Sequence, residues 1–481
     1  MASSTARPTD HDDPGDHDDP FERAYKAGVV QRQLPQGADV GAAGGGPERV
    51  SHAVPSEPYA LAGCVLTPDG PVEGGHVVIG ADGRIAAVQA ARPQGVAVLD
   101  TGGVILPGLI DLHGHPEFNV FAAWEPPMLF ANRYRWRGSA IYQQLVRDPQ
   151  NRLIAALPSG TQLRYAEVRA LVGGTTAIQG ASGKNRSSEE ALVRNVDLNI
   201  FGQHKARSMI DLPSSGSRDL VRLDGILADI QTGDVTAFYL HLAEGMPDDE
   251  RSGKEFARLV ELKGLTPATI IIHGSALTRD QLGDVKDAGA KLVWSPQSNL
   301  RLYGTTTAAA DAIELGIPVG LGADWLPSGS TSLLAELKVA ARVLGRQGKP
   351  RTPRQLVEMV TSTAAEIAGL SDHLGRVEAG RPADLLVLER IHQDPWTSVV
   401  ASDPSRVELV TIGGDLAYGR ADWVTELAAS TDQLEQVIAW GQAMLLDSSF
   451  QAKPTAARPP GLGRLRADLI ASYPQVGPIF A

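Results

Sequence analysis

Cysteine is nearly absent from this sequence of 481 residues, and long apolar runs are absent as well. The single cysteine, Cys64, excludes a disulfide within the chain. No apolar run approaches the roughly 18 residues that a membrane-spanning helix needs. The opening residues, MASSTARPTDHDDPGDHDDP, show neither a basic start with an apolar segment nor an arginine-rich amphipathic pattern. These features predict a cytoplasmic protein without a membrane partner.

Basic residues are also scarce relative to acidic ones. The 44 lysines and arginines stand against 56 aspartates and glutamates, which gives a net charge of −12. A protein that binds nucleic acid needs a concentrated basic face, because it must neutralise phosphates. The composition therefore argues against nucleic acid as the main partner and suits a metabolic enzyme with a small-molecule substrate.

Changes in composition along the chain predict four parts. Residues 1–57 are rich in Gly, Pro, Asp and Ala, and such a segment buries too little apolar surface to fold, so we expect a disordered tail. Residues 58–103 and 376–425 contain short apolar runs separated by turn signals, and they predict one small β-sandwich domain built from two segments. Residues 426–481 are expected to form a long helix followed by a tail.

The remaining part, residues 104–375, alternates apolar strand-like runs with helix-length segments. This alternation predicts an α/β fold with a parallel sheet, and the number of units predicts a closed (β/α)8 TIM barrel. The chemistry of such barrels lies at the C-terminal ends of the strands. After a first strand in VILPGLIDLHGH, the expected strands are TTAIQG, RSMIDL, VTAFYLHLAEG, ATIIIHGS, AKLVWSPQSN and PVGLGADW.

The first expected strand ends in two histidines, His113 and His115. Alternate residues of a strand share a face, so both imidazoles can point toward one ion. Taken alone, the pair could equally be two surface or core histidines. The metal is favoured because three later strands also end in residues that bind metals or transfer protons. These residues are His241, His273 and Asp324.

Three histidines and one carboxylate can surround one divalent ion and leave a position for water. When the ion is zinc, the pKa of that water falls to about 7, so hydroxide becomes available at neutral pH. We therefore expect one divalent ion, most simply zinc, with iron and manganese as alternatives. The expected ligands are His113, His115, His241 and Asp324.

The motifs PGLIDLHGH, HLAE, IIIHG, SPQSN and LGADW occur in this order, and through them the chain resembles the amidohydrolase superfamily. Within that superfamily it is most similar to the cytosine deaminase and chlorohydrolase-like branch. The resemblance covers roughly residues 59–420 and includes the closing segment GRVEAGRPADLLVLE. It implies the same four metal ligands. It further implies that Glu244 shuttles a proton to the leaving nitrogen, that His273 orients or polarises the substrate, and that Asp324 accepts a proton from the attacking water.

A second metal ion is the competing hypothesis. Binuclear members of the superfamily use a carboxylated lysine at the end of the fourth strand, and here that strand ends in Asp211. Lys184 follows the third strand and Lys205 precedes the fourth, so neither fits this position well. We therefore expect a mononuclear centre, with a second ion on Lys184 as the alternative.

The resemblance implies a metal-dependent hydrolase that uses an activated water on a carbon–nitrogen bond other than an ordinary peptide bond. The bond could belong to an amide, a cyclic amide or an amidine, and the reaction could be a deamination. Alternatives are cleavage of a modified peptide in natural-product maturation, hydrolytic dechlorination of a heterocycle, and a non-catalytic binding barrel, which would be expected to lack ligands that this chain keeps. The sequence is compatible with a homo-oligomer. The choice among these substrates is left open by the sequence.

Overall fold

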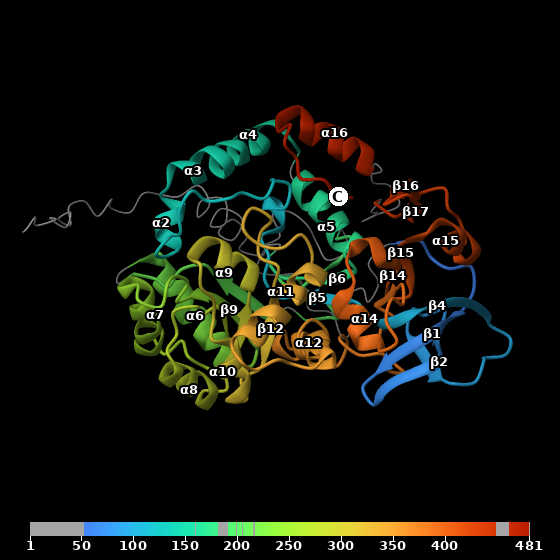
Figure 1. Ribbon diagram of the computed structural model, residues 1–481, viewed down its shortest axis with the longest axis horizontal. Helices are drawn as coiled ribbons and strands as arrows, with labels where there is room; N and C mark the ends of the chain where they lie inside the picture. Colours follow the sequence, from blue (N-terminus) through green and yellow to red (C-terminus); the bar gives the residue numbers. More distant parts are fainter. Residues whose placement is uncertain are drawn as a thin grey trace, which may run out of the picture. The chain divides into compact units, whose positions relative to one another are not determined.

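The computed structural model describes residues 52–158, 160–180, 191–198, 200–203, 205–214, 217–448 and 461–480. Residues 1–51 of the predicted tail and Lys184 therefore lie outside the described residues. Strands and helices alternate over most of the described chain (Figure 1), and its strands form sheets of nine, five and three strands. Where the structure describes the chain, no helix is long and apolar enough to cross a membrane.

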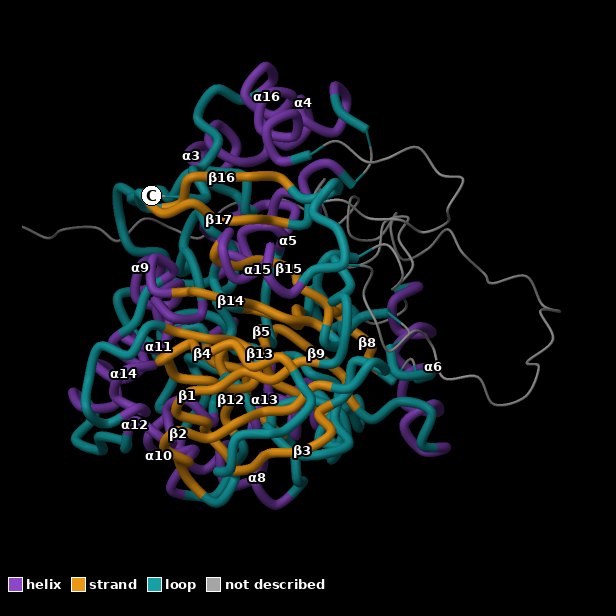
Figure 2. The backbone as a smooth tube through the Cα atoms, turned by 90° about the vertical axis from the view of Figure 1, so that its right-hand side faces the viewer, coloured by secondary structure: helices purple, strands orange, loops and turns teal. Residues whose placement is uncertain are grey.

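The nine-stranded sheet joins the two segments that the sequence assigns to one β unit. Its strands follow one another in the order β16-β17-β15-β14-β13-β4-β1-β2-β3 (Figure 2). Side chains from both segments share one buried cluster that includes Leu61, Ile85, Val387 and Leu409. The two segments thus lie in one sheet, while their folding as a separate two-layer sandwich domain stays a prediction. The strands are β1 (Tyr59–Thr67), β2 (Gly70–Ile79), β3 (Ile85–Gln89), β4 (Ala97–Pro107), β13 (Leu385–Leu388), β14 (Val407–Ile412), β15 (Asp415–Arg420), β16 (Glu435–Ala439) and β17 (Gln442–Leu446).

The other two sheets are parallel and carry the strands expected from residues 104–375. One sheet has the order β5-β6-β7 and the other β12-β11-β10-β9-β8. The amide of Leu112, next to β5, donates to the carbonyl of Leu321 in β12, so the two sheets meet at this edge. The result is a TIM-barrel-like α/β fold. Its strands are β5 (Leu109–Asp111), β6 (Thr175–Ile178), β7 (Arg194–Asn195), β8 (Ala206–Met209), β9 (Ala237–Leu242), β10 (Thr269–His273), β11 (Lys291–Trp294) and β12 (Val319–Leu321).

Helices follow most of these strands. Several begin with a side chain that accepts a hydrogen bond from a free backbone amide of the first turn, as Thr278 does for the amide of Gln281 at the start of α8. Their buried side chains, such as Leu223 and Leu259, pack toward the sheet. The helices are α5 (Thr161–Val172), α6 (Arg218–Thr232), α7 (Glu250–Glu261), α8 (Arg279–Asp287), α9 (Pro296–Tyr303), α10 (Ala309–Glu314), α11 (Leu333–Arg346), α12 (Pro353–Glu358) and α13 (Ser362–Ile367), with α14 (Pro395–Ala401) and α15 (Ala421–Leu427) in the closing segment.

The predicted first barrel strand is wrong in its first half. Val104 to Pro107 belong to β4 and pair with β13 in the nine-stranded sheet, and the parallel strand β5 begins only at Leu109. Gly108 separates the two, and a Cβ atom at this position would lie 2.2 Å from the Thr176 Oγ1. A residue without a side chain is therefore required where the chain passes from one sheet to the other.

A long excursion lies between β5 and β6. It contains α2 (Arg133–Arg137), α3 (Ala140–Tyr142), one π-helical turn at Gln143–Arg147, and α4 (Asp148–Ala156). The last helix of the chain, α16 (Leu462–Ser472), contacts α4 and α5, as Figure 1 shows at the top of the view. Residues that are far apart in the sequence therefore pack together beside the excursion.

The long helix predicted at the start of residues 426–481 is wrong. Over residues 426–446 the only helical residues are the last ones of α15, which ends at Leu427, and residues 435–446 form the hairpin β16–β17. Trp440 and Gly441 adopt φ angles of 48° and 84°, the left-handed pair that a two-residue hairpin turn needs. Pairing of Tyr418 with Leu446 adds the hairpin to the large sheet. Tertiary pairing thus outweighs the helical propensity of this stretch.

The predicted boundary of the N-terminal tail also shifts. His52 is buried and its Nε2 lies 2.6 Å from the carbonyl oxygen of Leu192. Ala53 and Pro55 form β-bridges with Leu416 and Ala428. Residues 52–57 therefore belong to the folded protein, because their backbone is paired with it.

Removal of residues 1–50 should leave turnover and metal content unchanged, because their composition predicts a disordered tail and no catalytic motif lies within them. Comparison of the truncated and full chains by kinetics and metal analysis checks this expectation. Truncation through residue 57 is the matched control, and it should reduce thermal stability because it deletes the pairing with Leu416 and Ala428. A large fall in activity of the shorter truncation at equal metal content would contradict the prediction.

Candidate active site

The six site residues predicted from the sequence come together at the C-terminal ends of the parallel strands. His113 and His115 follow β5, while His241 lies in β9 and His273 ends β10. Two residues separate Asp324 from the end of β12, and one residue separates Glu244 from the end of β9. All six are buried except His115, whose side chain is 14% exposed. The strand-end rule therefore selects residues that lie together in the structure, and their functional roles stay predictions.

The potential ligand atoms form two overlapping groups centred on His113. One group holds His113, His115 and Asp324, and the other holds His113, His241 and His273, with all atoms of a group within 4.8 Å of one another. The His113 Nε2 lies 3.2 Å from the Asp324 Oδ1, and the His115 Nε2 lies 3.6 Å from the same oxygen. The rings of His113 and His241 are 4.7 Å apart between centroids.

The backbone bends sharply where the strands deliver these side chains. His273 and Asp324 have φ angles of 67° and 61°, which L-residues with side chains rarely adopt. Such strain persists only where the surrounding structure holds it, and it is typical of functional sites. Close packing adds a second constraint, because a Cβ on Gly322 would lie 2.4 Å from the His113 Cβ.

The electrostatics of the group suit a divalent cation. Burial lowers the pKa of His115 and of His273 to about 3, and it holds the pKa of His241 well below its usual range. Burial alone would raise the pKa of Asp324, but the neighbouring imidazoles, His113 first, hold it below its usual range. At neutral pH His115, His241 and His273 therefore offer neutral imidazoles, and Asp324 offers an ionised carboxylate.

Unsatisfied buried nitrogens show that a metal ion fits this group. Among the described residues, both ring nitrogens of His113 and the Nδ1 of His241 are buried without a hydrogen-bond partner. Buried polar atoms usually have partners, because desolvation without compensation is costly. A cation coordinated by these nitrogens would supply the missing interaction.

Glu244 lies beside this group and is set up for proton transfer. Its Oε2 is 3.7 Å from the His273 Nε2, and its Oε1 accepts a hydrogen bond of 2.5 Å from the Tyr303 hydroxyl. Burial raises the pKa of Glu244 to about 6, although the Arg133 guanidinium and the Tyr303 hydroxyl oppose this effect. A carboxyl group whose pKa lies close to neutral pH can both take up and release a proton.

The position of the bridging lysine of binuclear relatives is occupied by an ion-pair network. Asp211 follows β8, and both Arg133 and Arg137 bind its carboxylate, at 2.9 and 3.1 Å. Arg133 also binds Glu255 at 3.0 Å. These two arginines are thus engaged with protein carboxylates. Lys205 lies just before β8, at the opposite end of that strand from Asp211.

Aromatic side chains gather next to Glu244 and Asp324. The Trp325 ring lies within 5.2 to 6.1 Å of four other rings between centroids. All five residues are buried, so these aromatic side chains pack mainly on one another. The four partners are Phe118, Trp124, Trp136 and Tyr142.

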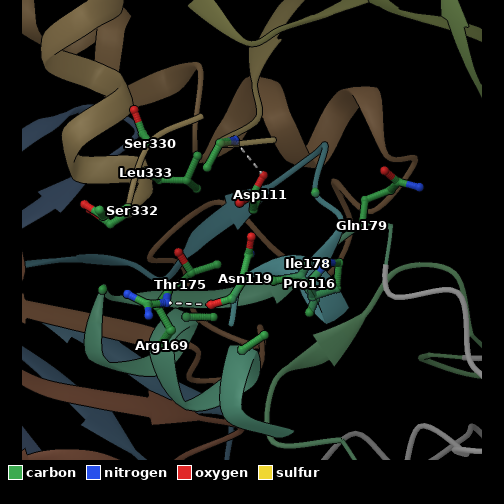
Figure 3. Close-up of a pocket in the computed structure, with 16 residues that line it drawn as sticks. Asp111, Pro116, Asn119, Arg169, Thr175, Ile178, Gln179, Ser330, Ser332 and Leu333 are labelled. Atoms are coloured by element: carbon green, nitrogen blue, oxygen red, sulfur yellow. Dashed lines mark hydrogen bonds between the residues drawn. The ribbon is translucent and has the colours of Figure 1, made fainter. Parts of the chain in front are cut away.

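A pocket lies on the outer side of β5, between that strand, α5 and the start of α11 (Figure 3). Side chains alternate along a strand, so Asp111 faces this pocket while Ile110 and Leu112 face the core. The Asp111 Oδ1 accepts hydrogen bonds from the amides of His113 and Ala323, and burial raises the pKa of this carboxyl to about 7. Asp111 therefore ties the end of β5 to the end of β12.

Arg169 on α5 connects the loop after His115 to the C-terminal segment. Its guanidinium donates to the carbonyls of Asn119, Gly477 and Pro478, and the amide of Gly477 donates to the carbonyl of Val120. This connection could not be predicted from the sequence, because its acceptors are backbone carbonyl oxygens, which every residue carries.

Arg169→Gln should lower the free energy of unfolding by about 1–3 kcal/mol, because it leaves buried carbonyls without their charged donor. It should also raise KM, since the loop held by Asn119 carries Phe118, which contacts Trp325. Urea unfolding and steady-state kinetics measure both effects. Arg346→Gln, at an exposed position, is the matched control. Equal stability and equal KM in the two variants would show that the connection has no influence on the site.

Comparisons with known proteins agree with this geometry. Residues 215–417 match the model of the amidohydrolase family. A 5-methylthioadenosine/S-adenosylhomocysteine deaminase from Teredinibacter turnerae is 26% identical over 396 residues, covering 69% of this chain and 84% of the relative. A 5'-deoxyadenosine deaminase from Methanosarcina mazei is 24% identical over 369 residues, covering 68% and 82%. The crystal structure of an adenosine deaminase from Xanthomonas campestris with bound zinc has a TM-score of 0.63 at 15% identity, covering 87% of this chain and 98% of that one, and it shows the fold alone.

A TIM-barrel-like fold with histidines and acids at the strand ends defines a metal-dependent hydrolase. The chain carries an amidohydrolase-family domain, and it is a hydrolase that acts on carbon–nitrogen bonds. This result confirms the family and the deaminase-like branch predicted from the ordered motifs.

Proposed function

We propose that this protein is a hydrolytic deaminase of an aminated nitrogen heterocycle, with adenine nucleosides altered at the 5' position as the first candidates. The observation that carries the proposal is the placement of the Glu244 carboxylate against the His273 imidazole, directly beside the histidine and aspartate group. A deaminase needs this combination because an amine leaves readily only after protonation. The names of the relatives from Teredinibacter turnerae and Methanosarcina mazei support the substrate class.

The proposed metal centre holds one divalent ion, zinc in the first place, with His113, His115, His241 and Asp324 as ligands. When bound, the ion would polarise a water molecule and lower its pKa toward neutrality. His273 lies within reach of the same group, but its Nδ1 is 3.0 Å from the Asn299 side-chain amide nitrogen, which can only donate. A neutral His273 then carries its proton on Nε2, which leaves this nitrogen without a lone pair for a metal. His273 is therefore not among the four proposed metal ligands and has a separate role.

The proposed chemistry divides the protons among three side chains. The ionised Asp324 carboxylate accepts a proton as water attacks the ring carbon that bears the amino group. Glu244 takes up the second proton of this water on its Oε2 and delivers it to the amino nitrogen, so that the carbon–nitrogen bond breaks with release of ammonia. Asp324 returns its proton to the adjacent ring nitrogen. His273 donates its Nε2–H toward the charge that develops on the substrate. The oxygen of water replaces the amino group, and the ring product is the corresponding carbonyl compound.

We also propose that β5–β12 close into one eight-stranded barrel. The hydrogen bond between Leu112 and Leu321 supports closure between β5 and β12. On the opposite side, the Gln179 side chain after β6 donates to the Ser208 hydroxyl in β8. A closed barrel would direct all eight strand ends to one mouth.

A substrate panel tests the proposal. The zinc-loaded protein is incubated with 5'-deoxyadenosine, 5-methylthioadenosine, S-adenosylhomocysteine, cytosine, guanine, a chlorinated triazine and simple amides, and ammonia release and product mass are read separately. We expect ammonia from an adenine nucleoside, with a mass gain of about one unit as the amino group becomes a carbonyl oxygen. The same panel with metal-stripped protein is the control. Release of chloride or cleavage of an amide, without ammonia from any aminated heterocycle, would contradict the proposal.

A further inference from the structure

We infer that α9 determines which atoms of the two acid–base residues accept or carry a proton. Tyr303 is the positioning residue for Glu244, and Asn299 is the positioning residue for His273. The two residues lie four positions apart on α9, so they project from the same face of the helix. Both are fully buried. The inference rests on the proposed function, because it assigns Glu244 and His273 to proton transfer.

The direction of the hydrogen bonds at Tyr303 follows from a donor-only neighbour. The Trp136 Nε1 donates to the Tyr303 hydroxyl oxygen at 2.9 Å, and an indole nitrogen cannot accept. The single hydroxyl proton of Tyr303 is therefore directed at the Glu244 Oε1, at 2.5 Å. This oxygen is held as an acceptor, and the Oε2, which faces His273, is left as the oxygen that exchanges the proton.

A second chain of hydrogen bonds begins at another indole and ends at His273. The Trp294 Nε1 donates to the Thr306 hydroxyl at 2.7 Å, and that hydroxyl donates to the Asn299 Oδ1 at 3.2 Å. The orientation of the Asn299 amide is thereby fixed, with its Nδ2 toward the His273 Nδ1 at 3.0 Å. The proton of neutral His273 is consequently placed on Nε2, 3.7 Å from the Glu244 Oε2.

Together, the two chains of hydrogen bonds place an acceptor oxygen of Glu244 opposite a donor nitrogen of His273. α9 itself is anchored by two contacts. The backbone amide of Gln297 donates to the Glu336 carboxyl group, and the hydroxyls of Ser298 and Ser328 are 2.8 Å apart. Asn299 and Tyr303 thus act through other residues. Fixed donors and acceptors of this kind reduce reorganisation during the reaction.

Tyr303→Phe tests the inference, since it keeps the ring and removes only the hydroxyl. We expect kcat to fall about 10- to 100-fold, the effect of losing one hydrogen bond to a charged group, with little change in KM or metal content. The hydroxyl favours the ionised form of Glu244, so its loss should also move the acidic limb of the kcat profile to higher pH. A change in packing alone would not move that limb.

Tyr59→Phe is the matched control. The Tyr59 hydroxyl is buried and donates to the carbonyl of Gly414 at 2.9 Å, within the β unit. This variant should lose a similar amount of stability, but its pH profile should not change. Trp136→Phe should have a smaller effect than Tyr303→Phe, and the double variant should resemble Tyr303→Phe, because both substitutions break the same chain.

A readout without substrate separates this inference from the proposed function. The indole N–H resonance of Trp136, assigned through Trp136→Phe, should shift in Tyr303→Phe and stay in place in Tyr59→Phe. If the wild type deaminates no nucleoside but the resonance shifts, the substrate class is wrong and the chain of hydrogen bonds stands. If the resonance stays in place, or if Tyr303→Phe keeps the wild-type kcat and acidic limb, the positioning role of Tyr303 is wrong.

Discussion

Glu244→Gln should lower kcat by about 10² to 10⁴-fold, the usual contribution of a general acid–base group, while the metal content stays the same. Glutamine keeps the size of the side chain and can still accept the hydrogen bond from Tyr303. It cannot take up a proton and release it to a leaving nitrogen. Glu244 is not among the proposed ligands, and its carboxylate faces the His273 Nε2 at 3.7 Å. The loss should therefore affect the rate of the reaction and leave the metal in place.

The pH dependence provides a second measure of the same residue. Burial raises the pKa of Glu244 to about 6, so the carboxylate becomes protonated as the pH falls through this value. Only the ionised form can accept a proton, so wild-type kcat should decline below about pH 6. The glutamine variant should lack this decline, because its side chain does not titrate.

Glu366→Gln, at an exposed position on α13, is the matched control and should behave as the wild type in both measurements. Metal analysis of each preparation distinguishes a chemical effect from metal loss. If Glu244→Gln keeps both its metal and the full rate on the identified substrate, Glu244 does not carry the proton. His273 or Asp324 would then have to perform every proton transfer.

The sequence predicts which residues lie together at the strand ends, because these ends carry a local signal. An apolar run marks each parallel strand, and a histidine or acid directly after it marks the mouth of the barrel. His113, His115, His241, His273 and Asp324 could all be found in this way, and the structure places them in two overlapping groups that share His113. The rule needs only the position of each residue along its own strand, so distant parts of the chain do not affect it.

The hydrogen-bond partners of the site could not be predicted in the same way. Trp136 comes from α2, Tyr303 from α9 and Glu244 from the end of β9, and only folding brings them together. The C-terminal hairpin could not be predicted for a related reason, because its strands depend on pairing with β15. The break at Gly108 was hidden because the apolar run continues through two different sheets. Long-range pairing leaves no local pattern that a single sequence can reveal.

A His113→Ala, His115→Ala double variant should bind essentially no metal and lose all measurable turnover. His113 belongs to both groups of potential ligand atoms, so its removal disrupts each of them. Loss of two nitrogens leaves His241 and Asp324, too few for the four-coordinate geometry that zinc favours. Atomic absorption of the purified variant, compared with the wild type, measures the loss directly.

Thermal stability gives a test of the same centre that does not depend on a substrate. A ligand present at about 1,000 times its Kd stabilises a fold by about 4 kcal/mol, so a chelator should lower the Tm of the wild type and zinc should restore it. The double variant should respond to neither treatment, because it has lost the site. His392→Ala, which removes an exposed histidine, should respond as the wild type does. The mononuclear centre would be overturned by two ions per chain at full occupancy in the wild type, or by retained metal in the double variant. If a chelator does not change the wild-type Tm, the ion does not support the fold.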